Sequence, residues 1–172
     1  MFNFKKNVLA SVLLMGMAAS AGANAASNAT VLWSGIVPTT SASDALVITG
    51  LAGDTTALNG AITASSDGVF ESDTIVLESH INDGDADAEI PVVGALASAN
   101  WTLVDASVTF DGLANPSQAV EVEVNGAPVV VGDVVPGVET ISTKIKQTAV
   151  LPEAEVGGTT VQASLTVMAD LV

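Results

Sequence analysis

The side chains that could carry covalent chemistry are few in this chain. His80 is the only histidine, and there is no cysteine. Nucleophilic catalysis needs a hydroxyl or thiol activated by a neighbouring base, so any such arrangement would have to form around His80. This residue follows an apolar segment and precedes an acidic one, a position typical of a surface or strand-end histidine. We therefore expect no catalytic residue and no enzymatic activity.

An acidic segment over residues 82–89 is the one constellation that suggests a metal ion. Ca²⁺ takes roughly six to eight oxygen ligands, and the candidates are Asp83, Asp85, Asp87 and Glu89. Their spacing does not match an EF-hand loop, and no zinc-ligand cluster or phosphate-binding glycine loop accompanies them. The sequence favours a solvated acidic loop, so we assign no metal and no cofactor. A Ca²⁺ site stays open as the alternative.

The first 25 residues have the pattern of an export signal. Lys5 and Lys6 precede an apolar run, Val8 to Met17, which is followed by Ala23-Asn24-Ala25, the pattern that signal peptidase cleaves. The apolar run is much shorter than the roughly 20 residues that a membrane-spanning helix needs. We expect residues 1–25 to be removed on export, with a retained membrane anchor as the alternative.

The rest of the chain is strongly acidic. It holds all 19 acidic side chains but only two basic ones, Lys144 and Lys146, which gives a net charge of −17. Binding to nucleic acid or to an anionic membrane surface requires clustered cations, so both functions are excluded. Without cysteine, stability must come from burial or from a partner. Aromatic residues are scarce, so we expect a core of Val, Leu, Ile and Ala.

Short segments rich in Val, Ile and Thr, separated by Gly, Pro, Asn and Asp, predict β-strands. No apolar period of 3.6 residues is long enough for a substantial helix. Seven or eight short strands are typical of an all-β antiparallel sandwich of one domain. The strands predicted in the middle of the chain are Ala45–Thr49, Thr74–His80, Trp101–Phe110, Ala119–Val124, Val129–Val131 and Thr140–Leu151.

Asn125-Gly126 marks the clearest hairpin. This pair favours the positive φ angles of a type I′ turn, whose twist matches the strands on either side. Pro128 cannot donate to a ladder, so the returning strand is expected at a sheet edge or after the proline.

Both ends of the mature chain contain alternating apolar residues. Near its start, one face of a strand holds Ala29, Val31, Trp33, Gly35 and Val37. Near its end, one face holds Val161, Ala163, Leu165, Val167, Ala169 and Leu171. An apolar strand at a terminus needs a host sheet. The two segments are either ordinary core strands of one sandwich, or a strand lent to another chain and a strand that flanks an open groove.

The two ends resemble the major subunits of bacterial fimbriae that a periplasmic chaperone and an outer-membrane usher assemble. The similarity is to the cysteine-free branch that includes the E. coli common pilus and the colonisation-factor pilins. It covers about a third of the chain and rests on Trp33-Ser34-Gly35, on the strand 45–49, on Leu151-Pro152-Glu153 and on Gly157-Gly158 before the last strand. The ending Asp170-Leu171-Val172 departs from the aromatic residue that many members carry there.

This resemblance implies an immunoglobulin-like sandwich that lacks a strand and is completed by one from a neighbour. Residues 1–25 would be the signal peptide, 26–38 the donor strand with the alternating residues 29–37, and 39–172 the sandwich domain, in which strand 161–171 lines one wall of the groove. The partners would be identical subunits in a filament, and the chaperone and usher during assembly. The filament would be a fimbria that supports adhesion or biofilm formation at the cell surface, reached through the periplasm.

Two other interpretations stay open. The chain could be a self-contained secreted β-sandwich that binds carbohydrate or Ca²⁺, or another extracellular matrix protein. In each of these interpretations we expect no nucleic acid partner and no stable membrane insertion after the signal is cleaved.

Overall fold

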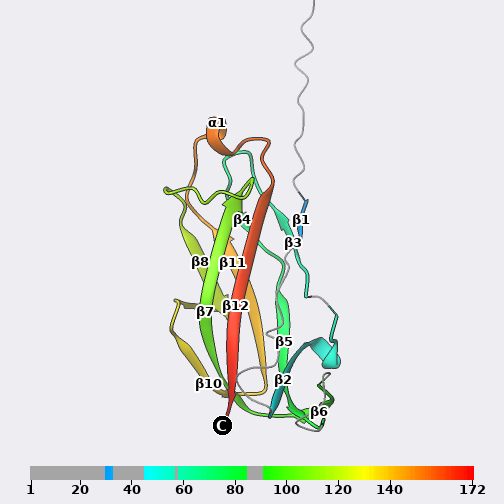
Figure 1. Cartoon of the computed structure of the whole chain (residues 1–172). Coiled ribbons are helices and arrows are strands. Elements are labelled where there is room, and N and C mark those ends of the chain that lie inside the picture. Colours follow the sequence, from blue (N-terminus) through cyan, green and yellow to red (C-terminus); the bar gives the residue numbers. More distant parts are fainter. Residues whose placement is uncertain (1–29, 33–44, 57, 85–90) are drawn as a thin grey trace, which may run out of the picture.

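The computed structural model of the chain describes residues 30–32, 45–56, 58–84 and 91–172 (Figure 1). The first strands are β1 (Thr30–Leu32), β2 (Leu46–Gly50), β3 (Ala61–Thr63), β4 (Phe70–Glu71), β5 (Ile75–Asn82) and β6 (Val93–Leu96). They are followed by β7 (Ala99–Phe110), β8 (Val120–Val124), β9 (Ala127–Val129), β10 (Val134–Val138), β11 (Thr140–Gln147) and β12 (Val161–Leu171). Two short helical turns interrupt them, η1 (Leu51–Gly53) and α1 (Glu153–Val156).

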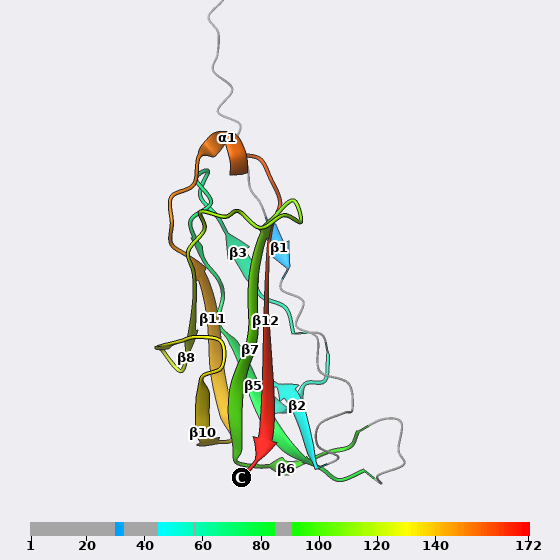
Figure 2. The ribbon, with the colours of Figure 1, turned by 60° about the vertical axis from the view of Figure 1, so that its left-hand side comes forward.

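The strands form an all-β antiparallel sandwich, as the sequence predicts. The larger sheet has the order β2-β5-β11-β8-β9, with β4 paired to β11 and β6 to β5. The smaller sheet has the order β10-β7-β12, and β1 pairs with β3 beside them. Figure 2 shows β7 and β12 in one layer and β5 and β11 in the other. All the strand pairs in the described residues are antiparallel.

The core lies between the two layers and follows the period-2 alternation of their strands. In β11 the buried positions alternate with partly exposed ones, so Ile141 and Ile145 face inward while Lys144 and Lys146 face outward. Although aromatic residues are scarce, three of them are buried in this core: Phe70, Trp101 and Phe110. The expectation of a purely aliphatic core was therefore wrong, because these large rings fill volume that Val and Ala leave between the sheets.

The hairpin at Asn125-Gly126 has the predicted turn. Both residues have positive φ, 52° and 75°, as a type I′ turn requires. The two-residue loop pairs Val124 with Ala127, so β9 begins directly after the turn and contains Pro128. The prediction of a strand at residues 129–131 was thus wrong in its bounds, because the strand covers residues 127–129. The expectation of an edge position for the proline is confirmed, because β9 is the last strand of its sheet.

β11 ends four residues before the predicted limit, and Gln147 explains why. Its fully buried side chain accepts hydrogen bonds from the N–H of Ala149 at 2.7 Å and of Ala119 at 3.1 Å. Its amide group donates to the carbonyls of Ala149 at 2.7 Å and Gly68 at 3.2 Å. The side chain thus takes the place of ladder partners and turns the chain out of the sheet.

Candidate functional site

The C-terminal strand β12 is the main candidate for a functional surface. It has 11 residues and pairs along its whole length with β7, from Val161–Phe110 to Leu171–Ala99. Among the residues that the structure describes, no strand pairs with its other side. A long edge strand presents a row of unpaired N–H and C=O groups to another strand. The strand has the bounds that the sequence predicts, residues 161–171.

The inward face of β12 is covered unevenly. Val161, Ala163 and Ala169 are buried, whereas Leu165 and Val167 in the middle of the strand are half-buried. Leu171, near the end, is 46% exposed. Two core-facing side chains at the centre of β12 therefore keep part of their surface exposed.

A second sheet edge lies across from this one. β2 approaches β12 from the larger sheet, and it pairs on one side with β5 (Figure 1). Its residues Leu46 and Ile48 are half-buried and pack on the core, as Leu165 and Val167 do. We call these four residues and the two strand edges that carry them the seam.

The predicted donor segment falls almost wholly outside the described residues. Ala29, Trp33, Gly35 and Val37 lie there, and of residues 30–32 only the backbone placement is described, so the face that Val31 presents is not described. Within that strand, Thr30 to Leu32 pair with Thr63 to Ala61 of β3 in the same chain. β1 also comes close to β12, beside its upper part in Figure 1. In this structure the chain's own N-terminal strand therefore flanks one end of the seam.

The acidic segment is described only at its borders. Asp83 lies in the described residues, while Asp85, Asp87 and Glu89 lie outside them. In the described part, no cluster of three or more metal-ligating side chains occurs. Asn82 closes the base of the loop, because its Oδ1 accepts hydrogen bonds from the N–H of Gly84 and of Val92, both at 3.0 Å.

His80 has a different environment from the one predicted. It lies two residues before the end of β5, but it is buried, with 7% of its surface exposed. Its Nε2 is 3.2 Å from Oε2 of Glu78, and its Nδ1 is 2.9 Å from the carbonyl oxygen of Gly94. Of the expected surface or strand-end position, the surface position was wrong, because η1 and β6 fold over this face of β5, whereas the position near the end of the strand is as expected. Within the described part of the chain, the ring bonds to a carbonyl and a carboxylate and to no serine, threonine or cysteine side chain.

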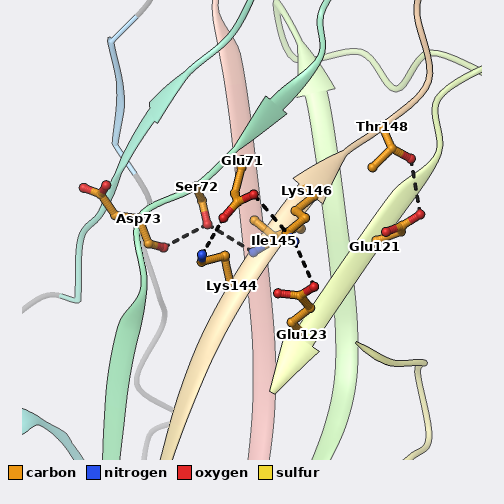
Figure 3. A network of polar contacts seen from close by, with 9 residues as sticks. All are labelled: Glu71, Ser72, Asp73, Glu121, Glu123, Lys144, Ile145, Lys146 and Thr148. Carbon is orange, nitrogen blue, oxygen red and sulfur yellow. Dashed lines mark hydrogen bonds and ion pairs between the residues drawn. The ribbon is translucent and has the colours of Figure 1, made fainter. Parts of the chain in front are cut away.

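Both lysines of the sandwich lie on the outer face of β11 and are held by carboxylates from two neighbouring strands (Figure 3). Lys144 pairs with Glu71 of β4. Lys146 lies 2.8 Å from a carboxylate oxygen of Glu123 on β8 and 3.5 Å from one of Glu71. This network holds β4, β11 and β8 in register on the surface. It leaves the outer face of the larger sheet without a free cation among the described residues.

Comparison with known proteins does not assign this chain to a family. No family model matches the chain, and no curated protein is recognisably related to it. Among the described residues, no helix has the length and apolar character needed to cross a membrane.

Proposed function

We propose that this chain is a structural subunit of a surface fimbria that polymerises by donor-strand complementation and supports adhesion or biofilm formation. The observation that carries the proposal is the seam. A strand of 11 residues has one free side among the described residues, and its central side chains, Leu165 and Val167, are half-buried. A strand added there would pair with the free edge and cover the core beneath it.

The energetics favour such an addition. Full burial of a Leu, Ile or Val side chain contributes about 1.5–3 kcal/mol, so completing the burial of a half-buried one contributes about 1 kcal/mol. The seam offers four such side chains, and each backbone hydrogen bond of the new ladder adds about 1 kcal/mol. A strand donated head to tail makes a contact that does not close, so the association extends into a filament.

The proposed donor is residues 26–38 of a neighbouring copy, with Trp33 as its largest apolar side chain. The signal pattern of residues 1–25 supports export through the periplasm, where a chaperone and an usher would act during assembly. The absence of cysteine fits this proposal, because burial of the donated strand would supply stability that no disulfide can.

A second candidate, a self-contained secreted β-sandwich, is favoured by one observation. Thr30–Leu32 pair with β3 of their own chain, so the N-terminal strand has a host sheet without a partner. This pairing covers three residues, whereas β12 has 11. The two candidates differ in where residues 26–38 lie in the assembled protein.

A pair of complementary variants separates the candidates. One variant lacks residues 26–38 and keeps the seam, and the other keeps the donor strand but carries Val167→Asp in the seam. Under the proposal neither polymerises alone, while a mixture forms a dimer that light scattering detects. Thr166→Asp, on the exposed face of the same strand, is the control and should still polymerise. A wild-type chain that stays monomeric, and that loses its stability when residues 26–38 are deleted, would rule out the lent strand.

A further inference from the structure

A buried polar cluster lies on the face of β5 away from the core. His80 and Glu78 point from this strand toward η1 and β6, and both are less than a tenth exposed. Glu78 Oε2 accepts a hydrogen bond from the N–H of Gly53 in η1 at 3.0 Å. The ring of His80 bridges that same carboxylate oxygen and the carbonyl of Gly94 in β6. One pair of side chains thus links three elements.

Both ring nitrogens of His80 face oxygen atoms that only accept hydrogen bonds. Nδ1 faces the carbonyl of Gly94 at 2.9 Å, and Nε2 faces the carboxylate of Glu78 at 3.2 Å. A neutral imidazole has one N–H, so it donates to one of these oxygens and turns a lone pair toward the other. The imidazolium has two N–H groups and donates to both. The geometry therefore fits the protonated ring.

The carboxylate of Glu78 is held in its charged form. Burial raises the pKa of Glu78, yet hydrogen bonds from Gly53, Ala52 and His80 together outweigh burial and keep that pKa below its ordinary value. A buried carboxylate needs a positive partner. The two described lysines are engaged with Glu71 and Glu123 on the outer face of β11, so the described residues offer His80 as the cation for this site.

We propose that His80 is a proton-binding switch, whose protonated ring clamps η1 and β6 onto β5. When the ring loses its proton, one of its two nitrogens no longer carries an N–H. That nitrogen then turns its lone pair toward an oxygen atom that can only accept a hydrogen bond. The link to β6 or the link to Glu78 then weakens. This clamp is a property of the single chain and does not depend on polymerisation.

The other residues that lie next to the ring or to its partner Gly94 bring no positive charge. Asp83, directly after β5, packs against Gly94, where an added β-carbon would lie 2.5 Å from the Asp83 side chain. Val47, opposite His80 on β2, is uncharged, as is Leu96, which pairs with His80 from β6. No positively charged group faces the ring among the described residues.

The consequences reach two parts of the chain. The clamp holds the start of β6, directly after Val92, whose carbonyl accepts a hydrogen bond from the N–H of Asp83 at 2.9 Å. It also stiffens the part of β5 that pairs with β2, where Val47 lies opposite His80. Loss of the proton therefore loosens the contact between Asp83 and Val92 and one edge of the sandwich together.

The sign of the pH effect follows from linkage. A histidine in an unfolded chain titrates near about pH 6.5. Because only the protonated ring donates to both oxygen atoms, the stability that the clamp contributes is present at acidic pH and is lost as the pH rises and the ring gives up its proton. We expect the thermal unfolding midpoint to be about 2–4 °C higher at pH 5.5 than at pH 8, the shift that a contribution of about 1 kcal/mol gives.

Three variants test this expectation in the full chain. His80→Gln and Glu78→Gln should each abolish the difference between pH 5.5 and pH 8. Glu123→Gln removes a carboxylate from a different ion pair and should leave the difference unchanged. A difference that persists in His80→Gln would overturn the proposal, because this is the only histidine in the sequence.

A measurement on the unaltered chain covers the case in which the variants fail to fold. Because there is one histidine, ¹⁵N NMR of the side chain reports this ring alone. We expect two protected ring N–H groups at pH 5.5. We also expect the amide of Ala97, which donates to Ser79 at 2.9 Å where β6 meets β5, to exchange faster after the ring loses its proton, once the intrinsic pH effect is removed. A folded ring that keeps a single N–H throughout would refute the switch.

Discussion

The indole N–H of Trp101 donates a hydrogen bond to the carbonyl oxygen of Val138, 3.0 Å away, from a side chain that is 1% exposed. The bond joins the middle strand of the smaller sheet to the end of β10, at the side of the sandwich opposite to the seam. On β7, the backbone of Trp101 lies opposite Ala169 of β12, a small residue that suits a bulky neighbour. Packing and hydrogen bonding thus meet in one residue at the centre of the smaller sheet.

The first prediction separates these two roles. Trp101→Phe keeps a buried ring but removes the donor to the part-buried carbonyl of Val138, and loss of such a hydrogen bond costs about 0.5–1.5 kcal/mol. Trp101→Ala also opens a cavity and should cost about 3–5 kcal/mol. Urea unfolding followed by circular dichroism measures both. A loss for Trp101→Phe as large as that for Trp101→Ala would show that the hydrogen bond, and not the packing, dominates.

The second prediction concerns the turn between β8 and β9. Gly126 has a φ of 75°, and a β-carbon added there would meet no atom within 4 Å. Gly126→Ala should therefore destabilise the fold by about 1 kcal/mol through backbone conformation alone. Asn125→Asp should be nearly neutral, because it keeps the side-chain oxygen that accepts the N–H of Ser142 at 2.8 Å. Denaturation midpoints test both, and a neutral Gly126→Ala would contradict the assignment of the turn.

The third prediction concerns the ion pairs on the outer face of β11. The hydrogen bond that Lys144 donates is the largest influence that lowers the pKa of Glu71. The hydrogen bond that Lys146 donates to Glu123 is the largest influence that raises the pKa of Lys146. The contribution of Glu71 is present above the pKa of the unfolded carboxyl and is lost as the pH falls. The contribution of Lys146 is present below the pKa of the unfolded amine and is lost as the pH rises through the folded value.

Lys146→Met should therefore flatten the alkaline part of the stability profile and lower the unfolding midpoint at neutral pH by a few degrees at most, because exposed pairs are weak. The difference from the wild type should shrink in high salt, which screens surface charges. Unfolding midpoints between pH 4 and pH 11, with and without added salt, measure this. Lys144→Met is the matched control, because it leaves the contact between Lys146 and Glu123 in place. An unchanged alkaline profile in Lys146→Met would contradict the role given to that pair.

How much could be predicted from sequence depends on how local the signal is. The bounds of β12 follow from strict alternation between Val161 and Leu171, because one face packs on the other sheet and the second meets solvent. β10 was missed because Pro136 and Gly137 within it indicate a turn. An edge strand with an irregular register between Val135 and Val138 tolerates both residues. β3 and β4 are too short to show a period.

The same holds for the candidate sites: features with a local sequence signal were predicted, and features that depend on distant residues were not. The seam follows from alternation at the chain's end, but its second wall required the position of β2 relative to β12. The environment of His80 could not be predicted, because its partners come from Gly94 and, through Glu78, from Gly53, which lie 14 and 27 residues away in the sequence. A hint was present in the spacing of Glu78 and His80, since residues two apart in a strand lie on one face.

The last prediction concerns Gln147, whose side chain is fully buried. Its amide NH₂ donates two hydrogen bonds, and its amide oxygen accepts two. Gln147→Glu keeps the shape but turns an acceptor toward the carbonyls of Gly68 and Ala149, where the amide donated. The carboxylate keeps the N–H donors of Ala149 and Ala119 on one oxygen, but its other oxygen faces two carbonyls in a buried site. We expect a loss of at least about 3 kcal/mol at pH 7.

The pH dependence of this variant identifies the cause. Burial and the facing carbonyls raise the pKa of the introduced carboxyl, so the variant gains stability relative to Gln147→Met as the pH falls and the group takes up a proton. A protonated carboxyl donates to one carbonyl and restores part of the network. Urea unfolding of both variants between pH 7 and pH 4 measures the change. A constant difference across this range would mean that packing, rather than the hydrogen-bond pattern of Gln147, ends β11.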